Sequence, residues 1–218
     1  MKKRKFSCVI FDCEGTLVDS ERLCCMALVQ VFNELGAQLT LHDVAQHFSG
    51  GKIADILADT LELAGMSADL DLLEVRYRQV LESIFMTQLK PMPGSESLLQ
   101  QLDQHHIEYC VASNAPYEKI VDSLSKAGLA DRFEGKIFSA FEANSWKPEP
   151  DLIRYCAMNM GFPLEECVYV DDTAKGVKAG VNAGVVTFQL QPLSPLNHFN
   201  HPNVRLLSHL DELMGHLF

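Results

Sequence analysis

The sequence predicts an α/β fold, a doubly wound parallel sheet into which a bundle of four helices is inserted. Three observations support this prediction. A short apolar run near the N-terminus ends in an acidic turn, residues 20–88 carry an almost wholly helical pattern, and from residue 90 onward short apolar runs alternate with amphipathic helices. A chain of 218 residues that is 47% apolar can bury a core of this size. We therefore expect an α/β core domain of residues 1–18 and 90–218 and a helical domain of residues 19–89.

The first apolar run, Cys8 to Phe11, is predicted to be a buried strand because it is short and rich in β-branched and aromatic residues. Asp12 and Glu14 follow at its carboxyl end, and Gly15 breaks the strand. Ligands of open α/β sheets bind at the carboxyl ends of the strands. Two crowded carboxylates repel each other there unless a cation or phosphate partner is supplied. By itself, such a turn is more often a polar connection than a site.

The helical segment has apolar residues three and four positions apart and is divided by glycines and short polar stretches. This pattern predicts four helices, at residues 20–36, 41–48, 53–65 and 70–89. The run Pro91-Met92-Pro93-Gly94 then marks the return to the core domain.

In the rest of the chain, short apolar runs typical of strands alternate with amphipathic segments typical of helices. This alternation is typical of a parallel sheet with helices on both faces. The predicted strands are residues 107–112, 137–138, 167–170 and 185–190. The predicted helices lie around residues 98–102 and at 117–127, 150–160 and 174–183. Residues 191–203, rich in Pro and Asn, are expected to form a surface loop, and residues 210–217 a final helix.

Three further polar groups follow predicted core elements. Ser113 and Asn114 come directly after one strand, and Asp171 and Asp172 directly after another. Lys147 stands between them in the chain, in a turn stiffened by the prolines that follow it. Adjacent carboxylates at a strand end are a hard-oxygen site suited to Mg²⁺. The alternative is that Asp172 or the next residue, Thr173, caps the following helix, and the two roles are compatible.

Together with the turn after the first strand, these groups resemble the four motifs of the haloacid dehalogenase superfamily, over essentially the whole chain. The first motif of that family is Asp-x-Asp-Gly-Thr-Leu-Val-Asp-Ser, and here Glu14 occupies the second acidic position. The resemblance implies the Rossmann-like core of this superfamily with a C1-type helical cap, and a Mg²⁺-dependent phosphatase that works through an aspartyl phosphate.

The resemblance also implies a role for each residue. Asp12 would be the nucleophile and Glu14 the general acid and base. Cys13, through its backbone, would contact the phosphate together with Ser113, Asn114 and Lys147, and Lys147 would also be a catalytic residue. Mg²⁺ would be held by Asp12, the backbone carbonyl of Glu14, Asp171 and, as a further or indirect ligand, Asp172.

The glycine loop Ser49-Gly50-Gly51 of the helical segment ends in Lys52, a cation at a predicted helix start. Two interpretations stay open. The loop reaches into the cleft, where Lys52 holds a second anionic group of a sugar phosphate, or it is an ordinary turn with a lysine that faces solvent.

Within the superfamily, the loop Phe48-x-Gly50-x-Lys52, the run Trp146-Lys147-Pro148 and the length of the chain are similar to those of bacterial 6-phosphogluconate phosphatases. The expected substrate is therefore a small phosphorylated metabolite, a sugar phosphate or a phospho-sugar acid. Cap loops of this kind also occur in phosphoglycolate phosphatases and in β-phosphoglucomutases, so a phosphosugar mutase is an alternative. A protein that binds phosphorylated metabolites with little turnover is another, because Glu14 replaces the usual Asp.

The composition limits the partners. A net charge of −11 argues against nucleic acid as a partner. The sequence contains no run of 18 apolar residues, so it predicts no membrane-spanning helix. Seven cysteines, an odd number without a zinc-like spacing, and no recognisable leader indicate a reduced, cytoplasmic chain. The basic run Lys2-Lys3-Arg4-Lys5 is expected to be solvated, and the chain to be a monomer.

Overall fold

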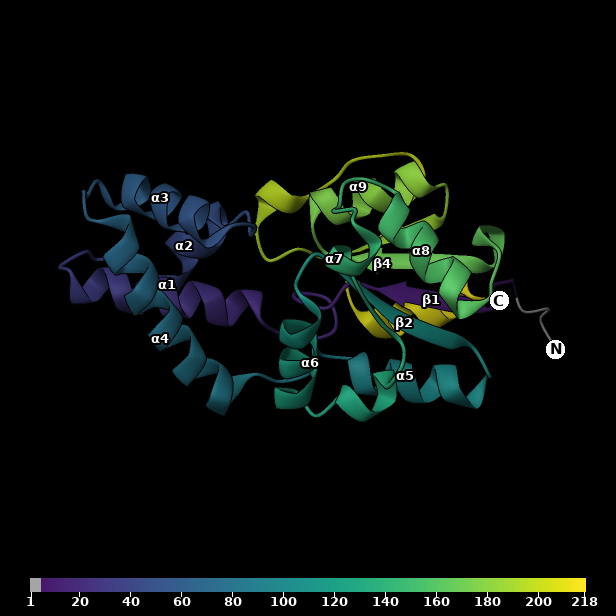
Figure 1. The fold of residues 1–218 in the computed structure, drawn as a ribbon. Coiled ribbons are helices and arrows are strands. Elements are labelled where there is room, and N and C mark those ends of the chain that lie inside the picture. Colours follow the sequence, from purple (N-terminus) through teal and green to yellow (C-terminus); the bar gives the residue numbers. More distant parts are fainter. Residues whose placement is uncertain (1–4) are drawn as a thin grey trace. The chain divides into compact units, whose positions relative to one another are not determined.

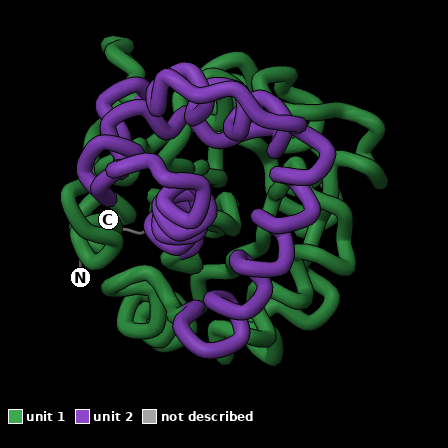
Figure 2. The backbone as a smooth tube through the Cα atoms, turned by 90° about the vertical axis from the view of Figure 1, so that its left-hand side faces the viewer, with its two compact units in different colours: residues 1–19, 90–192, 198–218 green, residues 20–89, 193–197 purple. Residues whose placement is uncertain are grey.

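The structure is a computed structural model that describes residues 5–218. Most of the predicted basic run, residues 2–4, lies outside the described residues. The chain divides into two compact units (Figure 2). The first, the core unit, runs through Asp19 and then covers Lys90–Pro192 and His198–Phe218, and the second, the helical unit, covers Ser20–Leu89 and Leu193–Asn197.

The core unit is built on a sheet whose described strands all run parallel, in the order β3-β2-β1-β4-β5-β6. Its strands are β1 (Cys8–Phe11), β2 (Glu108–Ser113), β3 (Ile137–Ser139), β4 (Cys167–Asp171), β5 (Val186–Leu190) and β6 (Val204–Leu207). The chain builds outward from β1 to β3 and then crosses to β4 on the other side of β1. The neighbours β1 and β4 therefore form the switch point of the fold, the place where open α/β sheets bind ligands.

Helices cover both faces of this sheet. The core unit has α5 (Ser95–Gln104), α6 (Tyr117–Lys126), α7 (Ala140–Ala143), α8 (Asp151–Met160) and α9 (Ala174–Ala183), with short 3₁₀ helices η1 (Ala130–Phe133), η2 (Leu164–Glu166) and η4 (Leu210–His216). Helices α8 and α9 lie on one face and α5 on the other (Figure 1). Apolar side chains of α8 and α9 pack on those of β1, β2 and β4 in a buried cluster. The predicted doubly wound parallel fold is confirmed.

The helical unit contains four α-helices, as the spacing of apolar residues predicts: α1 (Glu21–Glu34), α2 (Leu41–His47), α3 (Ile53–Ala64) and α4 (Leu70–Gln88). Local signals set their ends. Thr40 and Asp43 form a reciprocal capping box at the start of α2, and the Asp69 side chain caps α4. Gly65, in the left-handed conformation with φ of 62°, ends α3. No described helix is long and apolar enough to cross a membrane.

Two predictions for the C-terminal region are wrong, and one strand there was missed. The expected surface loop contains η3 (Pro195–Asn197), which belongs to the helical unit, where buried Ser194 donates a hydrogen bond to the Gln46 carbonyl at 3.3 Å. Strand β6 was not predicted, because at the edge of the sheet only its last residue is buried and its sequence shows no alternation. The predicted last α-helix is the 3₁₀ helix η4, whose buried Leu210 and Leu213 are three residues apart, the period of that helix.

Candidate active site

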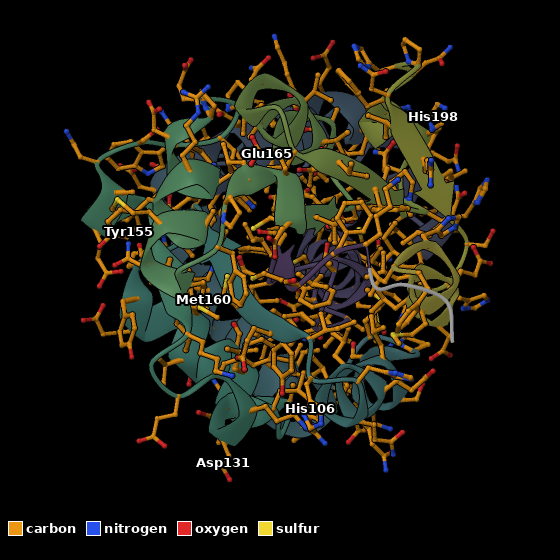
Figure 3. All side chains as sticks on the ribbon, turned by 90° about the vertical axis from the view of Figure 1, so that its right-hand side faces the viewer. His106, Asp131, Tyr155, Met160, Glu165 and His198 are labelled. Atoms are coloured by element: carbon orange, nitrogen blue, oxygen red, sulfur yellow. The ribbon has the colours of Figure 1, made fainter. Side chains whose placement is uncertain are left out.

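The predicted site residues of the core unit follow strands, so they meet at the carboxyl edge of the sheet. Asp12 follows β1, Ser113 ends β2 and Asp171 ends β4, and β1 is paired with both neighbours. Figure 3 views the core from the opposite end, where the labelled His106 and Glu165 precede β2 and β4. The site therefore lies at the switch point of the sheet.

Three buried carboxylates gather at this edge. Asp12, Asp171 and Asp172 each offer an oxygen, and these atoms lie within 4.8 Å of one another. Asp12 is 8% exposed, and the other two are 0% and 1% exposed. The turn after β1 passes so close that a Cβ at Gly15, whose φ is 78°, would overlap the Asp172 carboxylate. Only glycine suits this position, both for its conformation and for its size.

Lys147 lies between two of these carboxylates. Its Nζ is 2.5 Å from Asp12 Oδ1 and 2.9 Å from Asp171 Oδ2, and the residue is buried. The Asn114 side chain holds the Lys147 backbone at two points: Asn114 Oδ1 accepts from the Lys147 N–H at 2.9 Å, and Asn114 Nδ2 donates to the Lys147 carbonyl at 3.3 Å. The Asn114 side chain thus holds the Lys147 backbone in place, and the predicted contact of Asn114 with phosphate stays a prediction.

The burial of these charges shifts their protonation equilibria. Burial raises the pKa of the Asp12 carboxyl to about 7, against the opposing effect of the Lys147 ammonium. Burial by itself lowers the pKa of Lys147, but the negative charges of Asp12 and Asp171 outweigh it, and its pKa is raised above the ordinary value. Lys147 is therefore a permanent cation, whereas Asp12 takes up a proton near neutral pH when no further cation is present.

Asp171 is held by donors on both of its oxygens. Oδ1 accepts from the N–H and the hydroxyl of Thr173 at 2.8 and 2.7 Å, and Oδ2 accepts from Lys147 Nζ and from the Tyr169 hydroxyl. Thr173 also caps α9, accepting from the Gly176 N–H at 3.0 Å. The capping role that the sequence left open thus falls to Thr173.

Sequence reasoning missed Tyr169, Thr16 and Gln189. Tyr169 is fully buried beside Asp171, Thr16 donates to Asp172 Oδ1 at 2.8 Å, and Gln189 Nε2 donates to the Asp172 carbonyl at 3.0 Å. One signal was present for Tyr169, because residues two apart in a strand point to the same face. No local signal connects Thr16 or Gln189 to Asp172.

Ser113 and Cys13 are both buried at the site edge. Ser113 Oγ accepts from the Ala115 N–H at 3.1 Å, which fixes the turn after β2. Burial, together with the charges of Glu14 and Asp12, raises the pKa of the Cys13 thiol well above its ordinary value. Cys13 therefore carries a protonated thiol, which is a poor nucleophile, and the prediction that it acts through its backbone stands as a prediction.

The Glu14 carboxylate has a different partner from the other three. It is not part of the group of close carboxylate oxygens, and it forms an ion pair with Lys119 of α6 at 3.1 Å. Its side chain is 28% exposed. The metal contact predicted for Glu14 involves its backbone carbonyl, and both this contact and the role of the carboxylate in proton transfer stay predictions.

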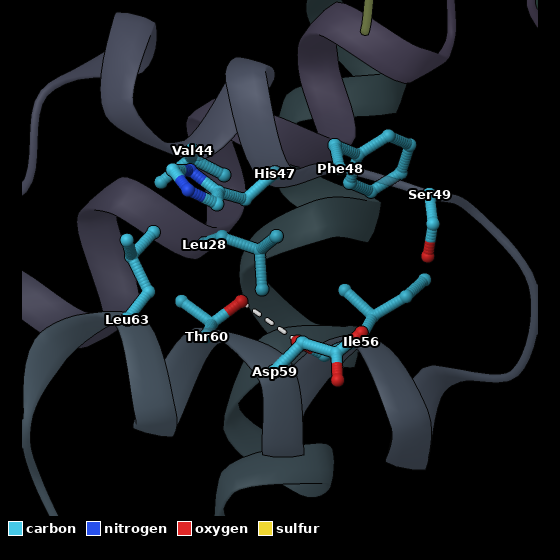
Figure 4. Close-up of a pocket in the computed structure, with 9 residues that line it drawn as sticks. All are labelled: Leu28, Val44, His47, Phe48, Ser49, Ile56, Asp59, Thr60 and Leu63. Atoms are coloured by element: carbon cyan, nitrogen blue, oxygen red, sulfur yellow. Dashed lines mark hydrogen bonds between the residues drawn. The ribbon is translucent and has the colours of Figure 1, made fainter. Parts of the chain in front are cut away.

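Lys52 belongs to the helical unit, where it is exposed and precedes α3. The loop before it, with Phe48 and Ser49, lines a pocket between α1, α2 and α3 (Figure 4). This pocket encloses only about 10 Å³, roughly one water, and is too small for a sugar phosphate. The role of Lys52 in substrate binding stays a prediction.

Comparisons with known proteins agree with this arrangement. The chain matches the family model of haloacid dehalogenase-like hydrolases over residues 9–190. It is 33% identical over 210 residues to a 6-phosphogluconate phosphatase of Escherichia coli, covering 96% of this chain and 93% of that protein. It is also 24% identical to a phosphorylated carbohydrates phosphatase of Thermotoga maritima, covering 81% of each chain.

The fold has close counterparts among solved structures. The crystal structure of a family hydrolase from Deinococcus radiodurans, with bound phosphate and sodium, matches with a TM-score of 0.80 and 26% identity, covering 99% of this chain and 96% of that one. The family model spans most of the sequence, and the relative from Escherichia coli matches it almost from end to end. The chain therefore belongs to the haloacid dehalogenase-like hydrolases.

Proposed function

We propose that this chain is a Mg²⁺-dependent phosphatase that hydrolyses a small phosphorylated metabolite through a phosphorylated Asp12. The observation that carries the proposal is the contact of Lys147 with Asp12 at the switch point of the sheet. A carboxylate beside a permanent cation can attack phosphorus and form a covalent intermediate, while the cation offsets the charge of the phosphoryl group.

The residues of the site fit Mg²⁺. The donor atoms are carboxylate oxygens, which this ion prefers, and they lie close enough together to share one ion. The three carboxylates carry three negative charges when ionised and Lys147 returns one positive charge, so a divalent cation would balance the site. Because both Asp171 oxygens already accept hydrogen bonds, we propose that Asp12 and Asp172 are the side chains nearest the ion. Asp171 then acts mainly by holding Lys147.

In the proposed mechanism, Mg²⁺ supplies positive charge against the phosphate oxygens when it is bound. Asp12 attacks phosphorus, and the bond to the leaving oxygen breaks as Glu14 donates a proton to it. Lys147 holds Asp12 in place and balances the negative charge of the transferring group. Glu14, now a carboxylate, takes a proton from water, and that water releases phosphate and restores Asp12.

The substrate class rests on the names of relatives. One related protein is a 6-phosphogluconate phosphatase and another acts on phosphorylated carbohydrates. We therefore propose a sugar phosphate or a phospho-sugar acid, with 6-phosphogluconate as the first compound to test, and a second anionic group of the substrate as the partner of Lys52.

The purified chain is expected to release inorganic phosphate from such compounds only when Mg²⁺ is present. Full chelation should abolish the release and added Mg²⁺ should restore it. Because protons compete with the ion for Asp12, whose pKa is about 7 without metal, the Mg²⁺ concentration for half-maximal rate should rise as the pH falls from 8 to 6. A panel of sugar phosphates and phospho-acids, assayed for phosphate at each pH, measures both effects.

Other outcomes separate the alternatives. Undiminished phosphate release after chelation would contradict the metal assignment. Isomerisation of a sugar phosphate that depends on a bisphosphate, without net phosphate release, would identify a mutase. Saturable binding of a compound in the panel without turnover would identify a binding protein.

Substitutions of Glu14 provide a second test. A protein that binds metabolites but has lost its activity could also have Glu in place of the usual Asp at this position. Glu14→Gln should lower kcat by about 10²-fold, near the lower limit for general acid–base catalysis, since the partly exposed site lets water replace some of the proton transfer. We expect Glu14→Asp to lower kcat as well, because the shorter side chain moves the carboxylate away from its place. Rates of the three proteins on the best substrate decide the question, and a marked gain for Glu14→Asp would favour the binding protein.

A further inference from the structure

The Glu14 carboxylate has a partner that proton transfer by itself does not require. Lys119 Nζ lies 3.1 Å from Glu14 Oε1, and the two side chains are 58% and 28% exposed. Ion pairs this exposed contribute little to stability, typically below about 1 kcal/mol. Because its contribution to stability is small, the effect of this pair that we consider is the placement of the Glu14 carboxylate.

Both backbones that carry the pair are fixed. On one side, Glu14 forms a β-bridge with Val18, and the Gly15 N–H donates to the Val18 carbonyl at 3.0 Å. On the other side, Lys119 lies in the first turn of α6, and its N–H donates to the Pro116 carbonyl at 3.0 Å.

The turn before α6 is anchored in its own right. The Ser139 hydroxyl donates to the Ala115 carbonyl at 2.7 Å, and Ser113 Oγ accepts from the Ala115 N–H. The freedom that remains in the pair therefore lies in the long Glu14 and Lys119 side chains themselves.

We propose that Lys119 is a positioning residue, which holds the Glu14 carboxylate in one orientation for the step of the reaction proposed above in which Glu14 takes a proton from water. A glutamate has one more rotatable bond than an aspartate, so its carboxylate is less well placed unless something holds it. The extra carbon also extends the carboxylate of residue 14, which lies 3.1 Å from Lys119 Nζ. The pair thus accounts for Glu in a position where the family pattern has Asp, because Lys119 restrains the longer side chain.

A double-mutant cycle tests this inference. Lys119→Met should lower kcat on the best substrate by about fivefold to tenfold with little change in KM, because it affects the placement of Glu14 and not the binding of phosphate. Lys119→Arg should keep most of the rate. In the Glu14→Asp background, where the carboxylate is one carbon shorter and we expect the pair to be weakened, Lys119→Met should change kcat less than about twofold.

Lys126→Met is the matched control. It removes a lysine from the same helix that is paired with Asp122 at 2.6 Å, and it should leave kcat unchanged. A readout that does not depend on turnover is a crystal structure of each variant. Lys119→Met should place the Glu14 carboxylate in more than one rotamer, whereas Lys126→Met should leave it in one.

An unchanged or higher kcat for Lys119→Met, or an equal loss in the wild-type and Glu14→Asp backgrounds, would overturn the positioning role. So would a single, unmoved Glu14 rotamer in the Lys119→Met structure. Failure of the proposed function looks different: the wild-type protein would release no phosphate from any compound of the panel, or Asp12→Asn would release it as fast as wild type. An inactive Asp12→Asn beside a fully active Lys119→Met would refute the positioning role and leave the proposed function standing.

Discussion

Asp12→Asn is expected to abolish phosphate release, by on the order of 10⁴-fold or more, and to leave the fold intact. The substitution removes the atom that would bond to phosphorus and a carboxylate that would hold Mg²⁺. The amide has nearly the same shape, so the packing around Lys147 is kept, and the amide oxygen can still accept the hydrogen bond that Asp12 Oδ1 accepts at 2.5 Å.

The same substitution should not destabilise the metal-free protein above pH 7. Asp12 has a pKa of about 7 in the folded protein against an ordinary value of 3.8, so between these values the folded state binds more protons than the unfolded state. The stabilising effect of this group is therefore present at low pH and lost as the pH rises to about 7. An asparagine at this position does not ionise, so the variant does not lose stability in this way as the pH rises.

Thermal or denaturant unfolding of both proteins in chelator, at pH 5 and pH 8, measures this difference. The unfolding free energy of the variant relative to wild type should be higher at pH 8 than at pH 5. A folded Asp12→Asn variant with substantial turnover would show that the nucleophile is another residue. A variant that is less stable at pH 8 than at pH 5, relative to wild type, would show that Asp12 is not a costly buried charge.

Lys147→Met is expected to reduce both activity and stability. Loss of the ammonium removes the positive charge nearest the nucleophile, and removal of one such electrostatic group typically costs about 10²–10³-fold in kcat. It also leaves the Asp12 and Asp171 carboxylates buried together without a cation, and breaking a buried pair in this way typically costs about 3–5 kcal/mol in the free energy of unfolding.

The loss of stability in Lys147→Met should depend on pH and on Mg²⁺. It should be largest in chelator above pH 7, and smaller at pH 5, where Asp12 can be protonated, or with Mg²⁺ present. Lys136→Met is the control, since Lys136 is a more exposed lysine paired with Glu108 at 2.9 Å and should cost less than about 1 kcal/mol. A Lys147→Met variant as stable as Lys136→Met would contradict the buried charge balance of the site.

The helices and central strands could be predicted because their signals are local. Apolar spacing located α1 to α4 and the strands β1, β2, β4 and β5 to within about two residues, and the cap residues lie beside the ends they set. Strand β6 and segment 193–197 had no such signal. One pairs at the edge of the sheet and the other packs on α2, and each is defined by a partner far away in the sequence.

The site residues likewise show which features the sequence predicts and which depend on the tertiary structure. The sequence by itself determined which residues reach the carboxyl edge of the sheet, because each of Asp12, Ser113 and Asp171 lies at the end of a strand and parallel strands end together. Only the tertiary structure decided what these residues do to one another. Lys147 reaches Asp12 from 135 positions away and Glu14 meets Lys119 on α6, while Asn114 holds the Lys147 backbone. Hydrogen bonds and ion pairs depend on distance in space, and the spacing of residues along a chain carries no record of it.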